Sequence, residues 1–337
     1  MTSAVLVTGG AGYIGSHIVA ALARAGRASV ILDNFQNSSP GVVARLVRLA
    51  GTPIPLVEGD VRDAGVLRAT FAAHRIGAVV HCAGMKAVGE SSARPLAYWD
   101  VNLNGTVRLA EAMGEAGVAT LVFSSSCTVY GQPDALPVGE DAPLRPASVY
   151  GRTKRAVEEF LRDLAGADAR WRIAILRYMN PAGAHPSALI GEAPLGRPNN
   201  LVPLMCRAVA GEFDEVPIFG TDWPTPDGTG IRDYIHVDDL AEGHLAALDH
   251  LGSHPGVLTL NLGAGRGYSV LEVVGAFEKA CGRPVPKVVA PRRDGDIASV
   301  YADASRALAL LGWRATRGLD AICEDAWRWQ RAGGRYA

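Results

Sequence analysis

The stretch VLVTGGAGYIGSH, residues 5–17, decides the fold because it joins an apolar run to a glycine-rich turn. Its glycines fit the spacing G-x-x-G-x-x-G through Gly9, Gly12 and Gly15. This spacing lets a backbone turn tightly and approach a pyrophosphate. Helical spacing begins directly afterwards, so the first N–H groups of a helix would face the phosphates. The stretch therefore predicts the first strand, turn and helix of a dinucleotide-binding fold.

Two acidic residues follow at the ends of the next predicted strands. Asp33 in VILDN comes 18 residues after Gly15. A carboxylate there accepts hydrogen bonds from an adenosine ribose 2'-OH and repels a 2'-phosphate, which favours NAD over NADP. Asp60 in EGDVRD fits either of two roles, a contact with the adenine or the N-cap of the following helix.

Short apolar runs alternate with amphipathic segments up to about residue 178, which predicts parallel strands joined by right-handed helical crossovers. We expect strands at 5–8, 29–32, 54–57, 78–82, 120–124 and 172–176, and helices at 13–25, 94–115 and 150–165. Further helices are expected at 201–211, 238–251, 269–281 and 318–330. The predicted fold class is α/β, a Rossmann-type doubly wound parallel sheet with a smaller C-terminal α/β substrate lobe. Residues 1–180 would form the cofactor domain and 181–337 the substrate domain, with some segments of the latter packing back on the first.

The composition narrows the partners and the compartment. The 337 residues include 33 basic and 34 acidic side chains, so neither nucleic acid nor a membrane surface is expected as a partner. No apolar stretch approaches the ~20 residues that span a bilayer. The five cysteines are odd in number and form no C-x-x-C pair, which indicates neither a disulfide framework nor a zinc site. We expect no metal and a cytoplasmic location.

The segment SVYGRTK, residues 148–154, places Tyr150 four residues before Lys154. Residues at this spacing share one helix face, and an ammonium beside a phenol favours the phenolate and lowers the tyrosine pKa. The pair therefore predicts an acid/base group that works near neutral pH. The similar segment TVYG has Asp134 four residues after Tyr130, which would raise the pKa of that tyrosine, so we interpret Tyr130 as structural.

The segment FSSSCTVYG, residues 123–131, leaves the predicted fifth strand at its carboxyl end. Ser126 is interpreted as a hydroxyl that holds the reacting alcohol and directs its proton toward Tyr150. Ser124 and Ser125 are interpreted as serines that satisfy a turn at the strand end.

The glycine signature, Ser126 and the Tyr-x-x-x-Lys pair together resemble the extended short-chain dehydrogenase/reductase superfamily. Along nearly the whole chain the resemblance narrows to the UDP-glucose 4-epimerase family. It is carried in order by TGGAGYIGSH, LDN, EGDVRD, AGMKAVGES, VNLNGT, FSSSCTVYG, YGRTK, LRYMNPAGAHPS, PNNL, IFGTD, DGTGIRDYIHVDDLA, NLGAG and APRRDGD.

The resemblance implies interconversion of UDP-galactose and UDP-glucose on a retained NAD+. Tyr150 would remove the proton of the sugar O4, Lys154 would bind the nicotinamide ribose, and Ser126 would hold O4. It also implies a homodimer formed through the helices near 94–115 and 150–165. Besides Gly9, Gly12, Gly15, Asp33, Asp60, Tyr150 and Lys154, the implied cofactor contacts are Tyr13, Ile14, Asn34, Asn37, Ser38, Val61, Ala83, Lys86 and Asn102.

The same resemblance implies the contacts of the nucleotide sugar. Besides Lys86, Ser126 and Tyr150, these are Asn180, Asn200, Leu201, Phe219, Arg232, Arg293, Asp296 and Val300. Two arginines clamp a diphosphate through charge-assisted hydrogen bonds. Val300 stands where family members restricted to unmodified sugars carry a tyrosine. Its small side chain predicts room for an acetamido group and hence activity on UDP-N-acetylglucosamine and UDP-N-acetylgalactosamine.

Two other functions compete with this interpretation. A nucleotide-sugar 4,6-dehydratase of the same superfamily needs an acidic pair after the strand-end hydroxyl, where this chain has Cys127 and Thr128. A noncatalytic NAD-sensing scaffold would keep the glycine turn but has no need of Ser126, Tyr150 and Lys154 together.

Overall fold

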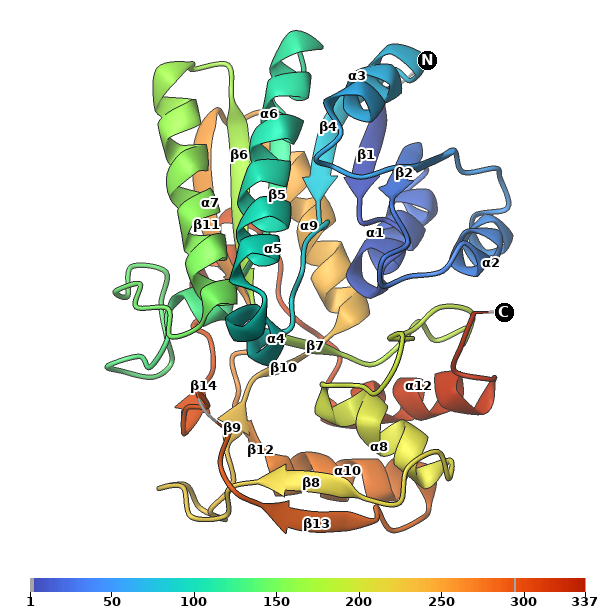
Figure 1. The fold of residues 1–337 in the computed structure, drawn as a ribbon, viewed down its shortest axis with the longest axis vertical. Coiled ribbons are helices and arrows are strands. Elements are labelled where there is room, and N and C mark those ends of the chain that lie inside the picture. Colours follow the sequence, from blue (N-terminus) through green and yellow to red (C-terminus); the bar gives the residue numbers. More distant parts are fainter. Residues whose placement is uncertain (1–2, 294, 337) are drawn as a thin grey trace.

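Seven parallel strands form the central sheet of the computed structural model, which describes residues 3–293 and 295–336. Their order is β11-β6-β5-β4-β1-β2-β3, so the sheet is doubly wound as predicted. The carboxyl ends of the strands point toward the second lobe (Figure 1). The strands are β1 (Ala4–Thr8), β2 (Ser29–Asp33), β3 (Leu56–Glu58), β4 (Ile76–His81), β5 (Thr120–Ser126), β6 (Arg172–Tyr178) and β11 (Gly256–Leu262).

Helices cover both faces of the sheet, which is why the central strands are apolar on both sides. Val7 of β1 belongs to a core with α1 (Tyr13–Arg24), α2 (Gly41–Ala50), α9 (Val237–Leu251) and α11 (Ser305–Leu311). Its neighbour Leu6 belongs to the opposite core, with α3 (Ala64–Ala73), α6 (Gly105–Glu115) and α7 (Val149–Ala167). Within residues 3–293 and 295–336, no helix is both long and apolar enough to cross a bilayer.

The helix expected at 94–115 is interrupted by one turn of π-helix. A short helix α4 (Val88–Ala93) precedes it, α5 (Pro95–Trp99) begins it, a π turn η1 covers Asp100–Asn104, and α6 continues to Glu115. A π turn adds a residue to the helical repeat and often lies at functional sites. Here it contains Asn102, whose buried side chain bonds to the loop after β4 and to α7.

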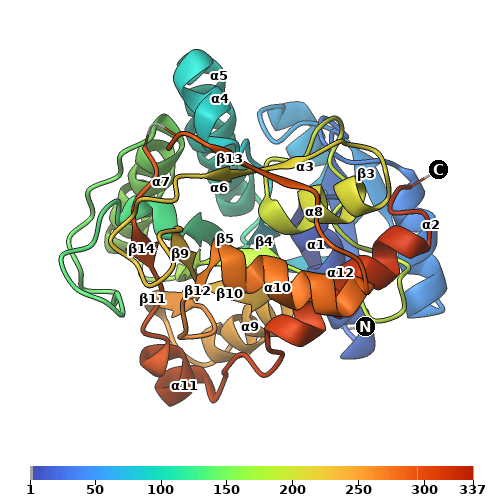
Figure 2. The ribbon, with the colours of Figure 1, turned by 90° about the horizontal axis from the view of Figure 1, so that it is seen from below.

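A smaller lobe lies beyond the carboxyl edge of the sheet and has its own core (Figures 1 and 2). Its helices are α8 (Leu201–Val209), α10 (Val270–Cys281) and α12 (Leu319–Arg331). Its short strands are β7 (Asn180–Ala182), β8 (Val216–Phe219), β9 (Ile231–Arg232), β10 (Tyr234–His236), β12 (Tyr268–Ser269), β13 (Lys287–Ala290) and β14 (Ser299–Val300).

The chain crosses between the two lobes more than once. The strand β11 and the helices α9 and α11 follow residue 180 in sequence but pack on the central sheet. They are segments of the kind expected to pack back on the first domain. The second lobe is therefore assembled from stretches on both sides of α9 and β11.

Candidate active site

The glycine turn between β1 and α1 is packed too tightly for side chains. Gly9 has a φ of +68°, and a Cβ on it would lie 2.8 Å from the backbone nitrogen of Ala83. A Cβ on Gly15 would lie 2.1 Å from the carbonyl oxygen of Gly9. Gly12 is the N-cap of α1, whose first turn contains no acidic residue. Bare backbone and a helix N-terminus free of negative charge fit the pyrophosphate of a dinucleotide.

Asp33 lies at the end of β2 and holds this turn to the loop that follows. Its Oδ2 accepts a hydrogen bond from the backbone N–H of Ala11 at 2.9 Å. Its Oδ1 accepts from the N–H of Phe35 at 2.9 Å and from the Ser38 hydroxyl at 2.8 Å. The carboxylate is thus buried and fixed beside the glycine turn, where the preference for an unphosphorylated ribose is predicted to arise.

Asp60 accepts hydrogen bonds from Asn34 at 2.9 Å and from the guanidinium of Arg62 at 2.8 Å. The Arg62 guanidinium holds the pKa of the Asp60 carboxyl well below its usual range. The N-cap of α3 is Asp63, which accepts from two N–H groups of that helix. The N-cap alternative for Asp60 is therefore wrong, since the next acidic residue takes that role. Val61, between these residues, is buried.

Three other predicted cofactor contacts, Tyr13, Ile14 and Asn37, lie around the same edge. The Tyr13 hydroxyl donates to the carbonyl of Gly183 at 2.8 Å, so this side chain joins α1 to the second lobe. Ile14 packs against the core beneath the turn. The Asn37 side-chain oxygen accepts from the backbone N–H of Leu195 at 3.4 Å.

Asn102 connects three segments of the cleft. Its Oδ1 accepts from the N–H of Met85 at 2.8 Å, and its Nδ2 donates to the Met85 carbonyl at 3.1 Å and to the Thr153 hydroxyl at 2.9 Å. A Cβ on Gly84 would lie 3.0 Å from this Oδ1 and 3.7 Å from the Nζ of Lys154. The π turn thereby fixes the loop after β4 against α7.

Ser126 lies at the carboxyl end of β5, and Tyr150 lies in the first turn of α7. Ser148 caps α7, since its hydroxyl accepts from the N–H of Gly151 at 3.0 Å. The Ser126 hydroxyl accepts from the N–H and hydroxyl of Thr128 at 3.2 and 3.0 Å. Burial raises the pKa of Tyr150 to about 12, and a hydrogen bond with Ser126 acts in the opposite direction.

Lys154 lies one turn further along α7 and is buried. Its ammonium donates to the carbonyl oxygen of Ser124 at 2.8 Å and lies 4.7 Å from the centre of the Phe123 ring. Burial lowers the pKa of Lys154 to about 8. The predicted depression of the Tyr150 pKa is not found, because burial penalises both charged forms and the ammonium is turned toward a carbonyl.

Tyr130, the near copy of Tyr150, lies in a closed polar network. Its hydroxyl donates to Asn261 at 2.6 Å and accepts from Arg177 at 3.1 Å. Burial raises its pKa to about 12, whereas Asp134, the predicted cause, pairs with Arg145 at 2.8 Å. Tyr130 is thus structural in this fold, for a different reason from the one the sequence suggested.

The other two serines at the end of β5 point into the protein. The Ser124 hydroxyl lies 3.2 Å from the Cys82 sulfur and 3.2 Å from His244 Nε2. The Ser125 hydroxyl donates to Glu158 at 2.6 Å. Ser124 and Ser125 therefore lie within β5 and do not satisfy a turn, so that interpretation is wrong. Of the three serines, Ser126 is the one that hydrogen-bonds with Tyr150.

The second lobe brings together most of the predicted nucleotide contacts. The guanidinium of Arg293 lies 4.6 Å from the centre of the Phe219 ring, and its Nε is 2.9 Å from Asp296 Oδ2. Arg232 lies in β9, and its guanidinium donates to the carbonyl of Ile231 at 2.8 Å. An aromatic ring, a carboxylate and two arginines thus share one end of this lobe.

Val300 lies beside Arg232 in the pairing of β14 with β9. Its side chain is 4% exposed and belongs to a small apolar cluster with Val129 and Met179. Asn180 begins β7, and its backbone N–H donates to the carbonyl of Asp233 at 3.0 Å. Val300 therefore lies between a predicted substrate arginine and the loop that follows Ser126.

Glu192 is a residue of the cleft that the sequence did not indicate. Its Oε1 accepts from the ammonium of Lys86 at 3.2 Å and from Nδ2 of Asn200 at 2.8 Å. Asn200 is the N-cap position of α8, and Leu201 begins that helix. No spacing rule connects a lone glutamate in a loop to a lysine 106 residues earlier, so only the folded structure brings the three together.

The comparisons with known proteins agree with this geometry. The model of the NAD dependent epimerase/dehydratase family matches residues 5–263. A UDP-glucose 4-epimerase of Yersinia pestis is 54% identical over 327 residues, 97% of both chains.

Two solved structures are also similar. One is a UDP-glucose 4-epimerase from Bifidobacterium longum in complex with NAD+ and UDP, with a TM-score of 0.96, 47% identity and coverage of 98% of this chain and 99% of that one. Another, from Stenotrophomonas maltophila with bound NAD and formylated UDP-arabinopyranose, has a TM-score of 0.97, 51% identity and full coverage of both chains. The chain therefore belongs to the NAD dependent epimerase/dehydratase family, among the UDP-glucose 4-epimerases.

Proposed function

We propose that this protein interconverts UDP-galactose and UDP-glucose by inverting the sugar C4 through a 4-keto intermediate on tightly bound NAD+. The observation that carries the proposal is the meeting of Ser126, Tyr150 and Lys154 beside the glycine turn, at the carboxyl edge of the sheet. The similarity to UDP-glucose 4-epimerases over nearly the whole chain supports it.

The cofactor would be held by the glycine turn of Gly9, Gly12 and Gly15 and by Asp33. When bound, NAD+ supplies a reversible hydride acceptor for the sugar C4. The fixed Asp33 carboxylate would accept from ribose hydroxyls and repel a 2'-phosphate. Asn102 would keep the loop after β4 closed against α7.

The proton chemistry falls to Tyr150 and Ser126. The Tyr150 phenolate would take the proton of the sugar O4 hydroxyl as the hydride leaves C4, and the resulting phenol would return that proton to O4 when C4 takes the hydride back. Ser126 would hold O4 and stabilise the phenolate by hydrogen bonding, which is the direction of its effect on the Tyr150 pKa. Lys154 would bind the nicotinamide ribose and favour the phenolate electrostatically.

The nucleotide sugar would bind in the second lobe. Arg232 and Arg293 would contact the diphosphate, Asp296 would accept from ribose hydroxyls, and the backbone near Phe219 would pair with uracil. The exposure of the Arg293 side chain, 51%, leaves its guanidinium accessible to such a ligand.

We also propose that the enzyme accepts UDP-N-acetylglucosamine and UDP-N-acetylgalactosamine. The support is the size of Val300 and its place beside Arg232 in the β9–β14 pair. A phenol ring in place of this isopropyl group would occupy space beside the sugar C2.

A homodimer built on α5, α6 and α7 is a further part of the proposal. Leu96 is 85% exposed and Trp99 is 37% exposed on the first of these helices, which leaves apolar surface available for a second copy. The division into a cofactor domain, 1–180, and a UDP-sugar domain, 181–337, is likewise proposed, with α9 and β11 returning to the first.

Incubation of the protein with each of the four UDP-sugars, followed by chromatographic separation of the products, tests these proposals. Conversion within each C4 pair is expected. Loss of water to a 4-keto-6-deoxy sugar would identify a dehydratase instead, and no conversion of any sugar would favour a noncatalytic role. Conversion of UDP-galactose without any conversion of the N-acetylated pair at high enzyme concentration would contradict the wider substrate range alone.

A further inference from the structure

One carboxylate joins the two sides of the cleft. Glu192 Oε1 accepts from the Lys86 ammonium at 3.2 Å and from the Asn200 side-chain amide at 2.8 Å. Lys86 lies on the loop after β4, beside the predicted cofactor site, while Asn200 lies at the start of α8 in the second lobe. A single oxygen atom of Glu192 therefore holds one group from each lobe.

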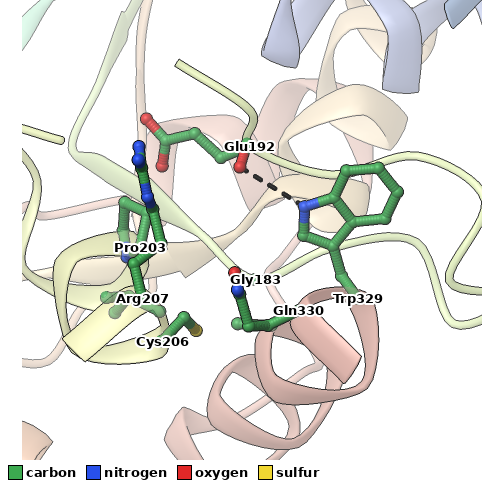
Figure 3. Close-up of a pocket in the computed structure, with 9 residues that line it drawn as sticks. Gly183, Glu192, Pro203, Cys206, Arg207, Trp329 and Gln330 are labelled. Carbon is green, nitrogen blue, oxygen red and sulfur yellow. Dashed lines mark hydrogen bonds between the residues drawn. The ribbon is translucent and has the colours of Figure 1, made fainter. Parts of the chain in front are cut away.

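The charge of Glu192 is directed at Lys86. The Glu192 side chain is only 9% exposed, whereas that of Lys86 is 50% exposed. Glu192 and Arg207 line one pocket (Figure 3). The Arg207 guanidinium, however, pairs with Glu212 at 2.9 Å. A nearly buried carboxylate binds its partner more strongly than an exposed one does, because water screens the pair less.

The backbone at Glu192 is fixed by the C-terminal part of the chain. The Trp329 indole N–H donates to the Glu192 carbonyl at 3.3 Å (Figure 3). The Tyr336 hydroxyl is bonded to both the N–H and the carbonyl of Gly191, at 3.0 and 2.9 Å. A Cβ on Gly191 would lie 2.6 Å from the Trp329 ring, so the ring packs directly against the backbone of this loop.

A residue of α2 in the first lobe, Arg45, also contacts this loop and the two aromatic rings. The Arg45 guanidinium lies 5.4 Å from the centre of the Trp329 ring and 5.2 Å from that of Tyr336. It also donates to the carbonyl of Leu189 at 3.3 Å. Residues 189–192 are therefore held by Arg45, Trp329 and Tyr336. These contacts fix the backbone position from which the Glu192 side chain extends.

We propose that Glu192 is a positioning residue, which orients Lys86 and Asn200 toward the bound nucleotide sugar without contacting the reacting atoms. The inference rests on the proposed function, in which both partners contact that ligand. Without the carboxylate, the long side chain of Lys86 would regain its rotamer freedom, and Asn200 would lose the partner that fixes its amide. Ligand affinity would suffer, while the Ser126–Tyr150–Lys154 group would keep its geometry.

The test compares Glu192→Ala and Glu192→Gln with wild type. Calorimetry with UDP gives the dissociation constant, and turnover of UDP-galactose gives KM and kcat. In Glu192→Ala we expect the UDP dissociation constant and KM to rise about tenfold, as for the loss of hydrogen bonds to a charged group, with kcat nearly unchanged. Glu192→Gln should recover part of the affinity, because its amide oxygen still accepts from Asn200.

Glu278 offers a matched control. Its Oε1 accepts from the Lys287 ammonium at 3.1 Å and from the N–H of Val285 at 2.9 Å, the same kinds of partner, between α10 and β13. Glu278→Ala should leave the UDP dissociation constant, KM and kcat as in wild type.

A double-mutant cycle with Lys86→Ala gives a second criterion that a general loss of stability would not meet. If Glu192 acts through Lys86, the affinity losses of the two changes should be clearly less than additive. Full additivity, or wild-type UDP affinity in folded Glu192→Ala, would overturn the proposal. A wild-type protein without epimerase turnover would contradict the proposed function instead, and the UDP dissociation constants would still decide the role of Glu192.

Discussion

The Lys154 ammonium lies 6.0 Å from the centre of the Tyr150 ring, one helical turn along α7. Both groups are buried, and burial raises the pKa of Tyr150 to about 12 while it lowers that of Lys154 to about 8. Burial thus disfavours the phenolate, and in the proposed mechanism its formation requires further stabilisation by Ser126 and by the charge of the bound cofactor.

Tyr150→Phe should lower epimerase turnover at least about 10²-fold to 10⁴-fold, the range for loss of a positioned general acid/base. The ring remains, so the melting temperature and the amount of bound NAD should stay close to those of wild type. Steady-state kinetics with UDP-galactose measures the effect. Unchanged turnover would refute the catalytic assignment of Tyr150.

Tyr130→Phe is expected to give the opposite result. The change leaves Asn261 and Arg177 without the hydroxyl that each contacts in the buried network. An unsatisfied buried group costs about 1–3 kcal/mol, so the free energy of unfolding should fall by about that amount in urea titrations, while turnover in the folded enzyme persists. A loss of turnover like that of Tyr150→Phe in a folded Tyr130→Phe protein would contradict the structural role of Tyr130.

Gly15→Ala should abolish NAD binding. The added Cβ would lie 2.1 Å from the Gly9 carbonyl oxygen, so the turn must open and lose the close approach that a pyrophosphate needs. Gly114→Ala in α6 is the control, since a Cβ there meets nothing within 4 Å. Measurement of released NAD by absorbance after denaturation separates the two. Normal NAD content in the Gly15→Ala variant would contradict the proposed binding of the pyrophosphate by the glycine turn.

Val300→Tyr should restrict the substrate range. The larger ring is expected to reduce conversion of UDP-N-acetylglucosamine by about tenfold or more, in line with the cost of about 1–3 kcal/mol for overpacking. Conversion of UDP-glucose should change much less. The ratio of kcat/KM for the two sugars is the measurement, and an unchanged ratio would exclude this position as the determinant.

Acid should destabilise the protein through its buried histidines. His81 lies between the hydroxyls of Thr8 and Thr106, at 2.7 and 2.9 Å, and burial lowers its pKa to about 3. An unfolded histidine titrates near 6.5, so the unfolded state binds the extra proton between pH 6.5 and 3. Stability is therefore full above pH 6.5 and falls as the pH drops through that window, by about 1.4 kcal/mol per pH unit for each such group. Urea titrations at pH 7, 6 and 5 measure the slope.

His81→Gln should reduce the pH dependence of the free energy of unfolding by the contribution of one histidine. His17 and His244, whose pKa values burial lowers to about 3 and about 4, would keep their share of the dependence. A slope identical to that of wild type would mean that His81 takes up its proton in the folded protein as readily as in the unfolded chain, so that burial does not lower its pKa.

Much of the fold was accessible from the sequence because its strands and helices have strong local patterns. The apolar run at 172–176 lies within β6 and the helical spacing at 238–251 lies within α9. The interruption at Asp100–Asn104 was not accessible, since the one residue that a π turn adds shifts the helical repeat too little to be recognised in so short a segment. The return of β11 to the sheet also depends on long-range pairing with β6, which no local pattern encodes.

The candidate site likewise contains some residues that local sequence patterns predict and others that only the folded structure reveals. The glycine turn, Asp33 and the Tyr150–Lys154 spacing follow from local geometry, and the structure places them at one edge of the sheet. The direction of the Tyr150 pKa shift and the role of Glu192 depend on burial and on contacts across more than 100 residues. Asp60 and Asp63 show the limit within a single loop, because the N-cap role that the sequence offered to Asp60 belongs to Asp63, while Asp60 pairs with Arg62.

The position of β11 also sets an order for biosynthesis. The seventh strand, Gly256–Leu262, pairs with β6, so a nascent chain that has emerged only to residue 250 carries β6 as an unprotected sheet edge. Such edges recruit strands of other chains, and incomplete domains expose apolar surface during synthesis. Ribosomal pausing between β6 and β11 would therefore promote aggregation, whereas pausing after Leu262 would leave β6 covered by β11 while α10 and α12 complete the second lobe.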